Sequence, residues 1–200
     1  MGWGPERNDN NMVAVLLADG FETAEGLVPV DILRRAGVKV VLAGLGSLEV
    51  ASSHGVIVKA ETTVDKLRVE DLDMIVLPGG LCGVENLRSN ETVRHLIVEM
   101  AKLDKLIGAI CAAPVLLAEL GILNDKRAVC YPDSTEQIAM RGAKPQTDEL
   151  VTNDRNIITS KAAGTSFDFG LKLVAMLLGW QASEKVRKSI YYRDLSVSLT

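Results

Sequence analysis

One stretch of the chain decides its fold: Leu106-Ile107-Gly108-Ala109-Ile110-Cys111-Ala112-Ala113-Pro114-Val115-Leu116-Leu117-Ala118-Glu119-Leu120-Gly121. Its first five residues are apolar or Gly, which predicts a short strand buried on both faces. Pro114 is tolerated only in the first turn of a helix, and the residues after it continue a helical pattern that Gly121 can end. Cys111 is therefore expected at a sharp turn between a buried strand and the N-terminus of a helix, which is the geometry of a nucleophile elbow.

Two interpretations of Cys111 follow from this placement, and the residues of the stretch alone favour neither. A helix N-terminus offers free N–H groups and the positive end of the helix dipole, and both favour a reactive thiolate. A free cysteine in apolar surroundings is, on the other hand, most often a small buried hydrophobic residue.

The composition is that of a globular protein. The chain has 200 residues, 48% of them hydrophobic, and a net charge of -4; this predicts a single domain over residues 12–200 and no nucleic-acid partner. No apolar run approaches the length of a membrane span, so no membrane partner is expected. Residues 1–11 are polar, lack the apolar core of a secretory signal and are expected to form a disordered leader.

The chain has three widely spaced cysteines, Cys82, Cys111 and Cys130, and only two histidines, His54 and His95. This spacing matches no zinc-binding pattern, so we expect no metal and no cofactor. An odd number of scattered cysteines is typical of the reducing cytoplasm. Cys82 and Cys130 are expected to be buried thiols, and either can resolve an oxidised Cys111 only if it lies within disulfide reach.

Apolar strand patterns alternate with helical patterns along the chain. Strands are expected at residues 12–18, 38–43, 73–78, 128–131, 150–152 and 156–160, and a hairpin within 48–59. Helices are expected at 23–36, 91–102, 134–141, 164–178 and 182–189, with a short helix and a loop within 61–72.

This alternation predicts an α/β fold, a three-layer sandwich whose mainly parallel sheet is covered by helices on both faces. In such sheets, sites lie beyond the carboxyl ends of the strands. Three loops each follow a strand and can converge there: residues 19–25, Gly79-Gly80 and the turn at Cys111.

Four motifs, in order along the chain, resemble the ThiJ/PfpI superfamily. They are Gly20-Phe21-Glu22-Thr23-Ala24-Glu25, Leu77-Pro78-Gly79-Gly80, Ala109-Ile110-Cys111-Ala112-Ala113-Pro114 and Gly164-Thr165-Ser166-Phe167-Asp168-Phe169. Within the superfamily, the motifs are most like the subgroup of the parkinsonism-associated deglycase and its bacterial relatives. The resemblance implies a flavodoxin-like sandwich and a homodimer.

The resemblance also implies which residues form the site. Cys111 matches the reactive cysteine of the family, and Glu25 matches the carboxylic acid that hydrogen-bonds it. Gly80 and Ala112 match the backbone N–H donors beside the sulfur, and Gly79, next to Gly80, is expected to lie just behind these donors and support them.

The chain departs from the family pattern at its histidines. Ala112 stands where the peptidase-like branch has a His, and Tyr131 stands where the human-type subgroup has the His of a His-Pro pair. Tyr131 either fills the site and donates its hydroxyl or simply packs. His54 corresponds to a family Arg that reaches toward the site of the partner subunit; the alternative is an exposed residue of the hairpin.

A thiol beside a carboxyl group predicts that the two share one proton, since two adjacent negative charges are unfavourable. Glu25 is expected to stay protonated while Cys111 ionises, with a thiol pKa below that of a free cysteine. The alternative for Glu25 is an ordinary acid in the first turn of a helix.

The residues and the resemblance together suggest two main functions. The first is an enzyme that uses Cys111 and Glu25 on small reactive aldehydes such as methylglyoxal, as a glutathione-independent glyoxalase or a deglycase. The second is a redox-responsive stress protein or chaperone-like protein that is switched by oxidation of Cys111 to the sulfinic acid. A cysteine peptidase or amidase is disfavoured by Ala112, and a thiamine-biosynthesis role finds no phosphate-binding loop.

Overall fold

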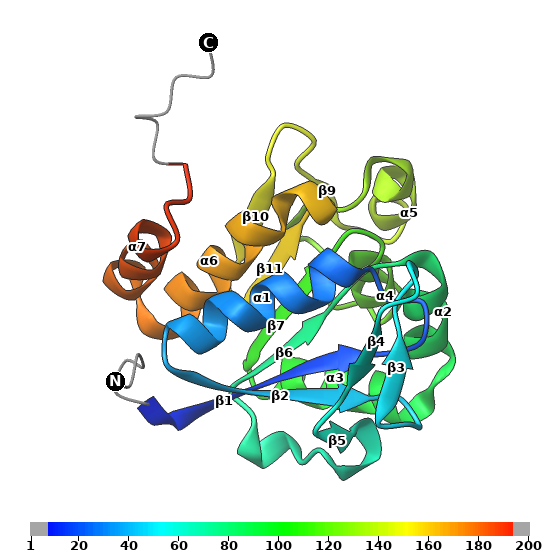
Figure 1. Ribbon diagram of the computed structural model, residues 1–200. Coiled ribbons are helices and arrows are strands. Elements are labelled where there is room, and N and C mark those ends of the chain that lie inside the picture. Colours follow the sequence, from blue (N-terminus) through cyan, green and yellow to red (C-terminus); the bar gives the residue numbers. More distant parts are fainter. Residues whose placement is uncertain (1–7, 194–200) are drawn as a thin grey trace.

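The computed structural model describes residues 8–193 and arranges them in three layers (Figure 1). The middle layer is a seven-stranded sheet in the order β10-β11-β7-β6-β1-β2-β5. Its neighbouring strands are parallel except for the antiparallel pair β10 and β11. The strands are β1 (Asn8–Leu17), β2 (Val38–Gly44), β5 (Thr62–Thr63), β6 (Met74–Leu77), β7 (Leu106–Ile110), β10 (Val151–Asp154) and β11 (Ile157–Ser160).

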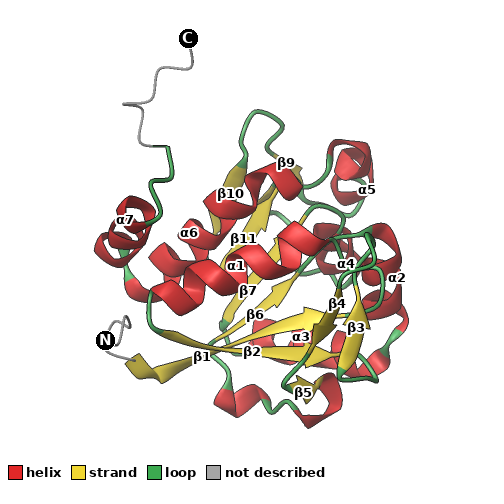
Figure 2. Cartoon of the chain, in the orientation of Figure 1, coloured by secondary structure: helices red, strands yellow, loops and turns green. Residues whose placement is uncertain are grey.

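Helices form the two outer layers. Figure 2 shows α1 and α6 lying across one face of the sheet, while α3 and α4 lie behind it. The helices are α1 (Thr23–Arg35), α2 (Leu81–Ser89), α3 (Glu91–Lys102), α4 (Ala113–Glu119), α5 (Thr135–Ala139), α6 (Ser166–Leu178) and α7 (Trp180–Ser189). The expected flavodoxin-like α/β sandwich with a mainly parallel sheet is confirmed.

Residues 13–17 of β1 show why the central strands are apolar where helices cover them. Val13, Val15 and Leu17 pack into the core beneath α1 and α6, whereas Ala14 and Leu16 pack into the core beneath α3 and α4. Successive side chains of a strand point to opposite faces. A strand that is covered on both faces therefore has no position for an exposed polar residue.

Two small two-stranded sheets accompany the main sheet. β3 (Glu49–Ala51) and β4 (Ile57–Lys59) form the expected antiparallel hairpin. β8 (Arg127–Ala128) pairs in parallel with β9 (Lys144–Pro145). The strand expected at residues 128–131 is therefore shorter and begins one residue earlier.

Four further segments differ from the sequence-based expectation. α2 was not predicted, and the segment 61–72 contains β5 and two 3-10 turns, at Val64–Lys66 and Val69–Asp71, rather than a short helix. The helix expected at 134–141 is reduced to α5, because a 3-10 turn occupies Pro132–Ser134. Residues 1–7 of the expected leader lie outside the described residues, whereas residues 8–11 belong to β1, where Asn8 pairs with Val38.

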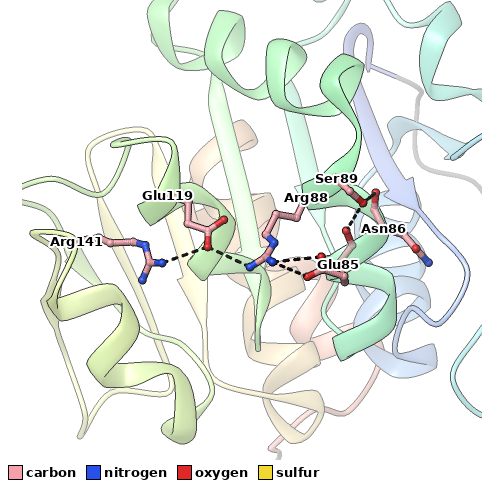
Figure 3. Close-up of polar contacts among 6 residues, drawn as sticks. All are labelled: Glu85, Asn86, Arg88, Ser89, Glu119 and Arg141. Atoms are coloured by element: carbon pink, nitrogen blue, oxygen red, sulfur yellow. Dashed lines mark hydrogen bonds and ion pairs between the residues drawn. The ribbon is translucent and has the colours of Figure 1, made fainter.

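A polar cross-link joins three helical segments on one side of the molecule. The Glu119 carboxylate at the end of α4 accepts from Arg88 of α2 at 3.2 Å and from Arg141, just after α5, at 3.3 Å (Figure 3). Arg88 also pairs with Glu85 one turn away.

Within residues 8–193, no helix is long and apolar enough to span a membrane.

Candidate functional site

The turn at Cys111 is a nucleophile elbow. β7 ends at Ile110, α4 begins at Ala113, and Cys111 between them has φ of +64°. A positive φ is costly for a residue other than glycine and persists only where neighbours hold it. Here the Cys111 N–H donates to the carbonyl of Ser160 at 3.0 Å, and the Cys111 carbonyl accepts from the N–H of Tyr131 at 2.8 Å.

The three loops converge on this elbow, as expected, because β1, β6 and β7 are adjacent parallel strands. Glu25 lies in the first turn of α1 and is only 1% exposed. Its Oε2 accepts from the N–H of Gly79 at 2.9 Å. Its carboxyl group also shares a hydrogen bond with the Cys111 thiol and accepts from the N–H of Ala163.

The pair Gly79-Gly80 is required by the packing of this site. A Cβ on Gly79 would lie 2.5 Å from Cys111 Cβ and closer still to Glu25 Oε2. Gly80 has φ of +90°, and a Cβ there would overlap the carbonyl oxygen of Gly20. The loop can approach both the thiol and the acid only because it carries no side chains.

Two backbone N–H groups, of Gly80 and Ala112, hydrogen-bond the Cys111 sulfur. Gly80 is the residue that precedes α2, and Ala112 is the residue that precedes α4. The N-terminal ends of two helices therefore both face one sulfur atom. Such an arrangement stabilises negative charge at the sulfur or at an oxygen next to it.

Burial sets the acidity of Glu25. It is the largest cause of the shift and, together with the nearby charge of Glu22, raises the pKa of this carboxyl group to about 7. The hydrogen bonds with Cys111 and with the N–H groups of Gly79 and Ala163 act in the opposite direction but are outweighed.

The acidity of Cys111 runs against the sequence-based expectation. Burial first, and then the charge and hydrogen bond of Glu25, raise the pKa of the thiol to about 12. The N–H groups of Gly80 and Ala112 lower the pKa, but not enough, so the expected shift below a free thiol is wrong in direction. Between these two values the coupled pair holds one proton, as expected. The values favour that proton on Cys111 rather than on Glu25, which is the reverse of the expectation that Glu25 stays protonated while Cys111 ionises.

Tyr131 and His54 are placed differently from the core of the site. Tyr131 touches the elbow through its backbone N–H, and the residue is 43% exposed. His54 is exposed on the hairpin turn, where its Nδ1 lies 3.1 Å from Ser53 Oγ. Ser53 in turn donates its N–H to the carbonyl of Phe21, so the hairpin is docked against the loop that leads to Glu25. In the described chain, His54 makes no hydrogen bond to Cys111 or Glu25.

The other two cysteines are free thiols. Cys130 is buried, as expected, and lines a cavity of about 50 Å³ with Thr135 and Lys161. Cys82 is exposed, which corrects the expectation that it is buried. It is the second residue of α2, and its burial could not be judged without that helix. Among residues 8–193, no group of three His, Cys, Asp or Glu side chains is placed to hold a metal ion.

Two contributors to the site were missed from the sequence. Glu22 is the N-cap of α1: its carboxylate accepts from the N–H of Glu25 at 2.8 Å. The spacing Glu22-x-x-Glu25 is that of a capping box and could have indicated this role. Ala163 contributes only a backbone N–H, for which its side chain gives no signal.

Comparison with known proteins places this geometry in a family. The model of the DJ-1/PfpI family matches residues 11–176. Protein dj-1beta of Drosophila melanogaster is 36% identical over 177 residues, 88% of this chain and 94% of that protein. Its crystal structure has a TM-score of 0.86 at 34% identity, and covers 91% of this chain and 98% of its own.

Two other relatives match this chain over a similar length. The Parkinson disease protein 7 homolog of Danio rerio is 32% identical over 90% of this chain and 96% of its own length. The glutathione-independent glyoxalase DJR-1.2 of Caenorhabditis elegans is 32% identical over 88% of this chain and 93% of its own length. With a family model that covers most of the chain and relatives that match nearly end to end, the protein belongs to the DJ-1/PfpI family.

Proposed function

We propose that this protein is a cytoplasmic, homodimeric enzyme of the glutathione-independent glyoxalase type, which converts small 2-oxoaldehydes such as methylglyoxal to 2-hydroxy acids. The observation that carries the proposal is the Cys111–Glu25 pair beneath the N–H groups of Gly80 and Ala112. A family relative named as a glutathione-independent glyoxalase supports the choice of substrate class.

The first step uses the shared proton and the two N–H groups. Glu25 takes the thiol proton as Cys111 Sγ attacks the aldehyde carbon, a C–S bond forms, and the carbonyl oxygen becomes an alkoxide. The proton then passes from Glu25 to that oxygen, which leaves a hemithioacetal and an ionised Glu25. Backbone N–H groups that face such an oxygen stabilise it, as in acyl-transfer sites. Glu25, whose pKa is about 7, can both hold and release a proton near neutral pH.

The second step moves a proton between neighbouring carbons. Glu25 removes the proton from the carbon bonded to sulfur, and an enediol forms; a proton is then returned to the adjacent carbon. The first carbon is oxidised to a thioester with Cys111 as the second is reduced to an alcohol, so no external oxidant is consumed. Water then hydrolyses the thioester, releasing lactate and the free thiol.

Methylglyoxal turnover tests the proposal directly. Wild type should produce lactate, and Cys111→Ala should abolish production because the nucleophile is lost. Glu25→Gln should lower it by a factor of roughly a hundred or more, as is typical for loss of a general base. Cys130→Ala, which removes a buried thiol outside the site, is the matched control and should stay near wild type.

Four further experiments test the details of the proposal. Chelator should have no effect in this scheme, because Cys111 supplies the thiol and Glu25 moves the proton. His54→Ala should have only a small effect, since His54 is exposed on the hairpin turn. Release of methylglyoxal from glycated thiols and amines tests the deglycase variant, and sedimentation tests the homodimer.

Two outcomes would overturn the enzymatic proposal. Lactate production by Cys111→Ala at the wild-type rate would remove Cys111 from the chemistry. If wild type makes no lactate while peroxide selectively oxidises Cys111 to the sulfinic acid, the redox-sensor function takes its place.

A further inference from the structure

Glu22 connects two of the three loops that form the site. Its carboxylate accepts from the N–H of Glu25 at 2.8 Å, and its own N–H donates to the carbonyl of Gly79 at 2.9 Å. The peptide N–H of Gly79 then returns to Glu25 Oε2 at 2.9 Å. Glu22, Glu25 and Gly79 therefore close a ring of three hydrogen bonds.

This ring is an altered capping box. In a standard capping box, the acid at the third helical position bends back to the N–H of the N-cap residue. Here that N–H, on Glu22, is already donated to the carbonyl of Gly79. The Glu25 carboxylate is thus free to face the Gly79 N–H and the Cys111 thiol instead.

The charge of Glu22 acts on the same pair. Four groups face the Glu25 carboxyl: the thiol of Cys111 after β7, the N–H of Gly79 after β6, the N–H of Ala163 after β11, and the Glu22 carboxylate before α1. Of these four groups, Glu22 acts on the Glu25 carboxyl through its negative charge and not through a hydrogen bond to that side chain. Within residues 8–193, Glu22 has no cationic side chain within ion-pair distance.

We propose that Glu22 is a positioning residue for the Cys111–Glu25 pair: its carboxylate fixes the first turn of α1 so that Glu25 meets the thiol, and its negative charge keeps the shared proton on the pair. The inference deepens the proposed function and rests on the same pair, but it concerns how the pair is held and charged rather than what it turns over.

Alkylation of Cys111 by iodoacetamide across pH, mapped to the Cys111 peptide by mass spectrometry, tests the charge. Glu22→Gln keeps a capping oxygen but removes the charge. The rise of the alkylation rate should shift to lower pH by roughly half a unit, because a like charge no longer opposes ionisation. Glu22→Asp keeps the charge and should stay near the wild-type profile. Glu91→Gln, which removes an exposed acid from the first turn of α3, is the matched control and should not shift it.

The cap is tested by Glu22→Ala. This variant should also shift the profile to lower pH and, in addition, should lower the maximal alkylation rate and the melting temperature, because the first turn of α1 loses its cap. If Glu22→Ala does not fold, the comparison of Glu22→Gln with Glu22→Asp still decides the matter.

The inference is overturned if Glu22→Gln has the profile of wild type and of Glu91→Gln, or if Glu22→Asp shifts as far as Glu22→Gln. These readouts do not depend on lactate. A wild type that makes no lactate but shows the predicted shifts would end the proposed function and leave the role of Glu22 intact. Normal lactate production together with unshifted alkylation profiles would end the role of Glu22 and leave the proposed function intact.

Discussion

Cys111 and Cys130 are two thiols in neighbouring segments of one molecule, and their surroundings differ in one decisive respect. Burial is the largest cause of a raised pKa at both. Cys111 shares a proton with the Glu25 carboxyl, whereas the Cys130 thiol lies 4.0 Å from the Thr135 hydroxyl. Burial alone makes a thiol inert; burial together with an acid that titrates near neutrality leaves one mobile negative charge at the site.

The largest effect is expected in the pH dependence of stability. The pKa of Glu25 is about 7 in the folded protein against 4.5 for an ordinary Glu, so the folded state binds more protons between these values. The contribution of Glu25 to stability is therefore fully present below pH 4.5 and is lost as pH rises through 7. The free energy of unfolding should fall by about 3 kcal/mol over this range. Urea unfolding from pH 4.5 to 8 measures this fall. Glu25→Gln should flatten the dependence of the unfolding free energy on pH, whereas Cys130→Ala should retain the wild-type dependence. A wild-type dependence in Glu25→Gln would show that another group causes the fall in stability.

The next largest effect separates the thiols by reactivity. At pH 7.5 the Cys111–Glu25 pair has lost its first proton, while burial keeps Cys130 a neutral thiol. We expect peroxide to oxidise Cys111 at least roughly thirtyfold faster than Cys130, since the ionised Glu25 beside Cys111 can take the thiol proton and so supply the thiolate, which is the reactive form. Peptide mapping after mild peroxide measures both sites, with Cys82 as the exposed reference. Equal oxidation of all three cysteines would show that Cys111 and Cys130 do not differ in reactivity.

A smaller effect should follow when Cys111 is made to resemble Cys130. Glu25→Leu removes the acid and leaves a buried thiol with its two backbone donors. Its alkylation should begin only near or above the pKa of a free thiol, about 8.5, instead of near 7. This is about a tenfold loss of rate at pH 7.5, measured with iodoacetamide. A profile that still rises near pH 7 would show that Glu25 is not half of the titrating pair.

The smallest effect is expected at the cross-link between the two regions. Glu119 ends the helix that follows the elbow, and its partner Arg141 follows α5, whose Thr135 lies beside the Cys130 thiol. Figure 3 shows the contact between Glu119 and Arg141. Arg88, its other partner, is 42% exposed. Glu119→Gln should therefore cost less than about 1 kcal/mol in denaturant unfolding and leave the alkylation profile of Cys111 unchanged. Glu49→Gln, in the exposed position of β3, is the control.

The elbow could be predicted because its signals are local. An apolar strand, Pro114 and the helical pattern after it determine β7 and α4 without knowledge of the rest of the chain. α2 could not be predicted in this way because Gly79, Gly80 and Gly83 read as a turn. Gly83 is in the helix for a tertiary reason: a Cβ there would lie 2.7 Å from the backbone N of Phe21.

The direction of the Cys111 pKa shift could not be predicted from the sequence for a similar reason. The helix N-termini that lower it are visible as patterns, but the depth of burial that raises it depends on how three loops pack. Glu22 shows the opposite case. Its capping spacing is present in the sequence, yet only the fold shows that the Gly79 peptide has replaced its usual partner.

The order of the strands has a consequence for the lifetime of the site. β6 and β7 are flanked on both sides by other strands and covered on both faces, and the elbow is the direct continuation of β7. Amide hydrogens in such strands exchange with solvent only through global opening, whereas those of the hairpin β3–β4 can exchange through local fluctuations. We therefore expect the Cys111 thiol to be attached to the slowest-opening part of the protein. A covalent change at Cys111 should lengthen or shorten the lifetime of the entire native state, rather than loosen a single loop.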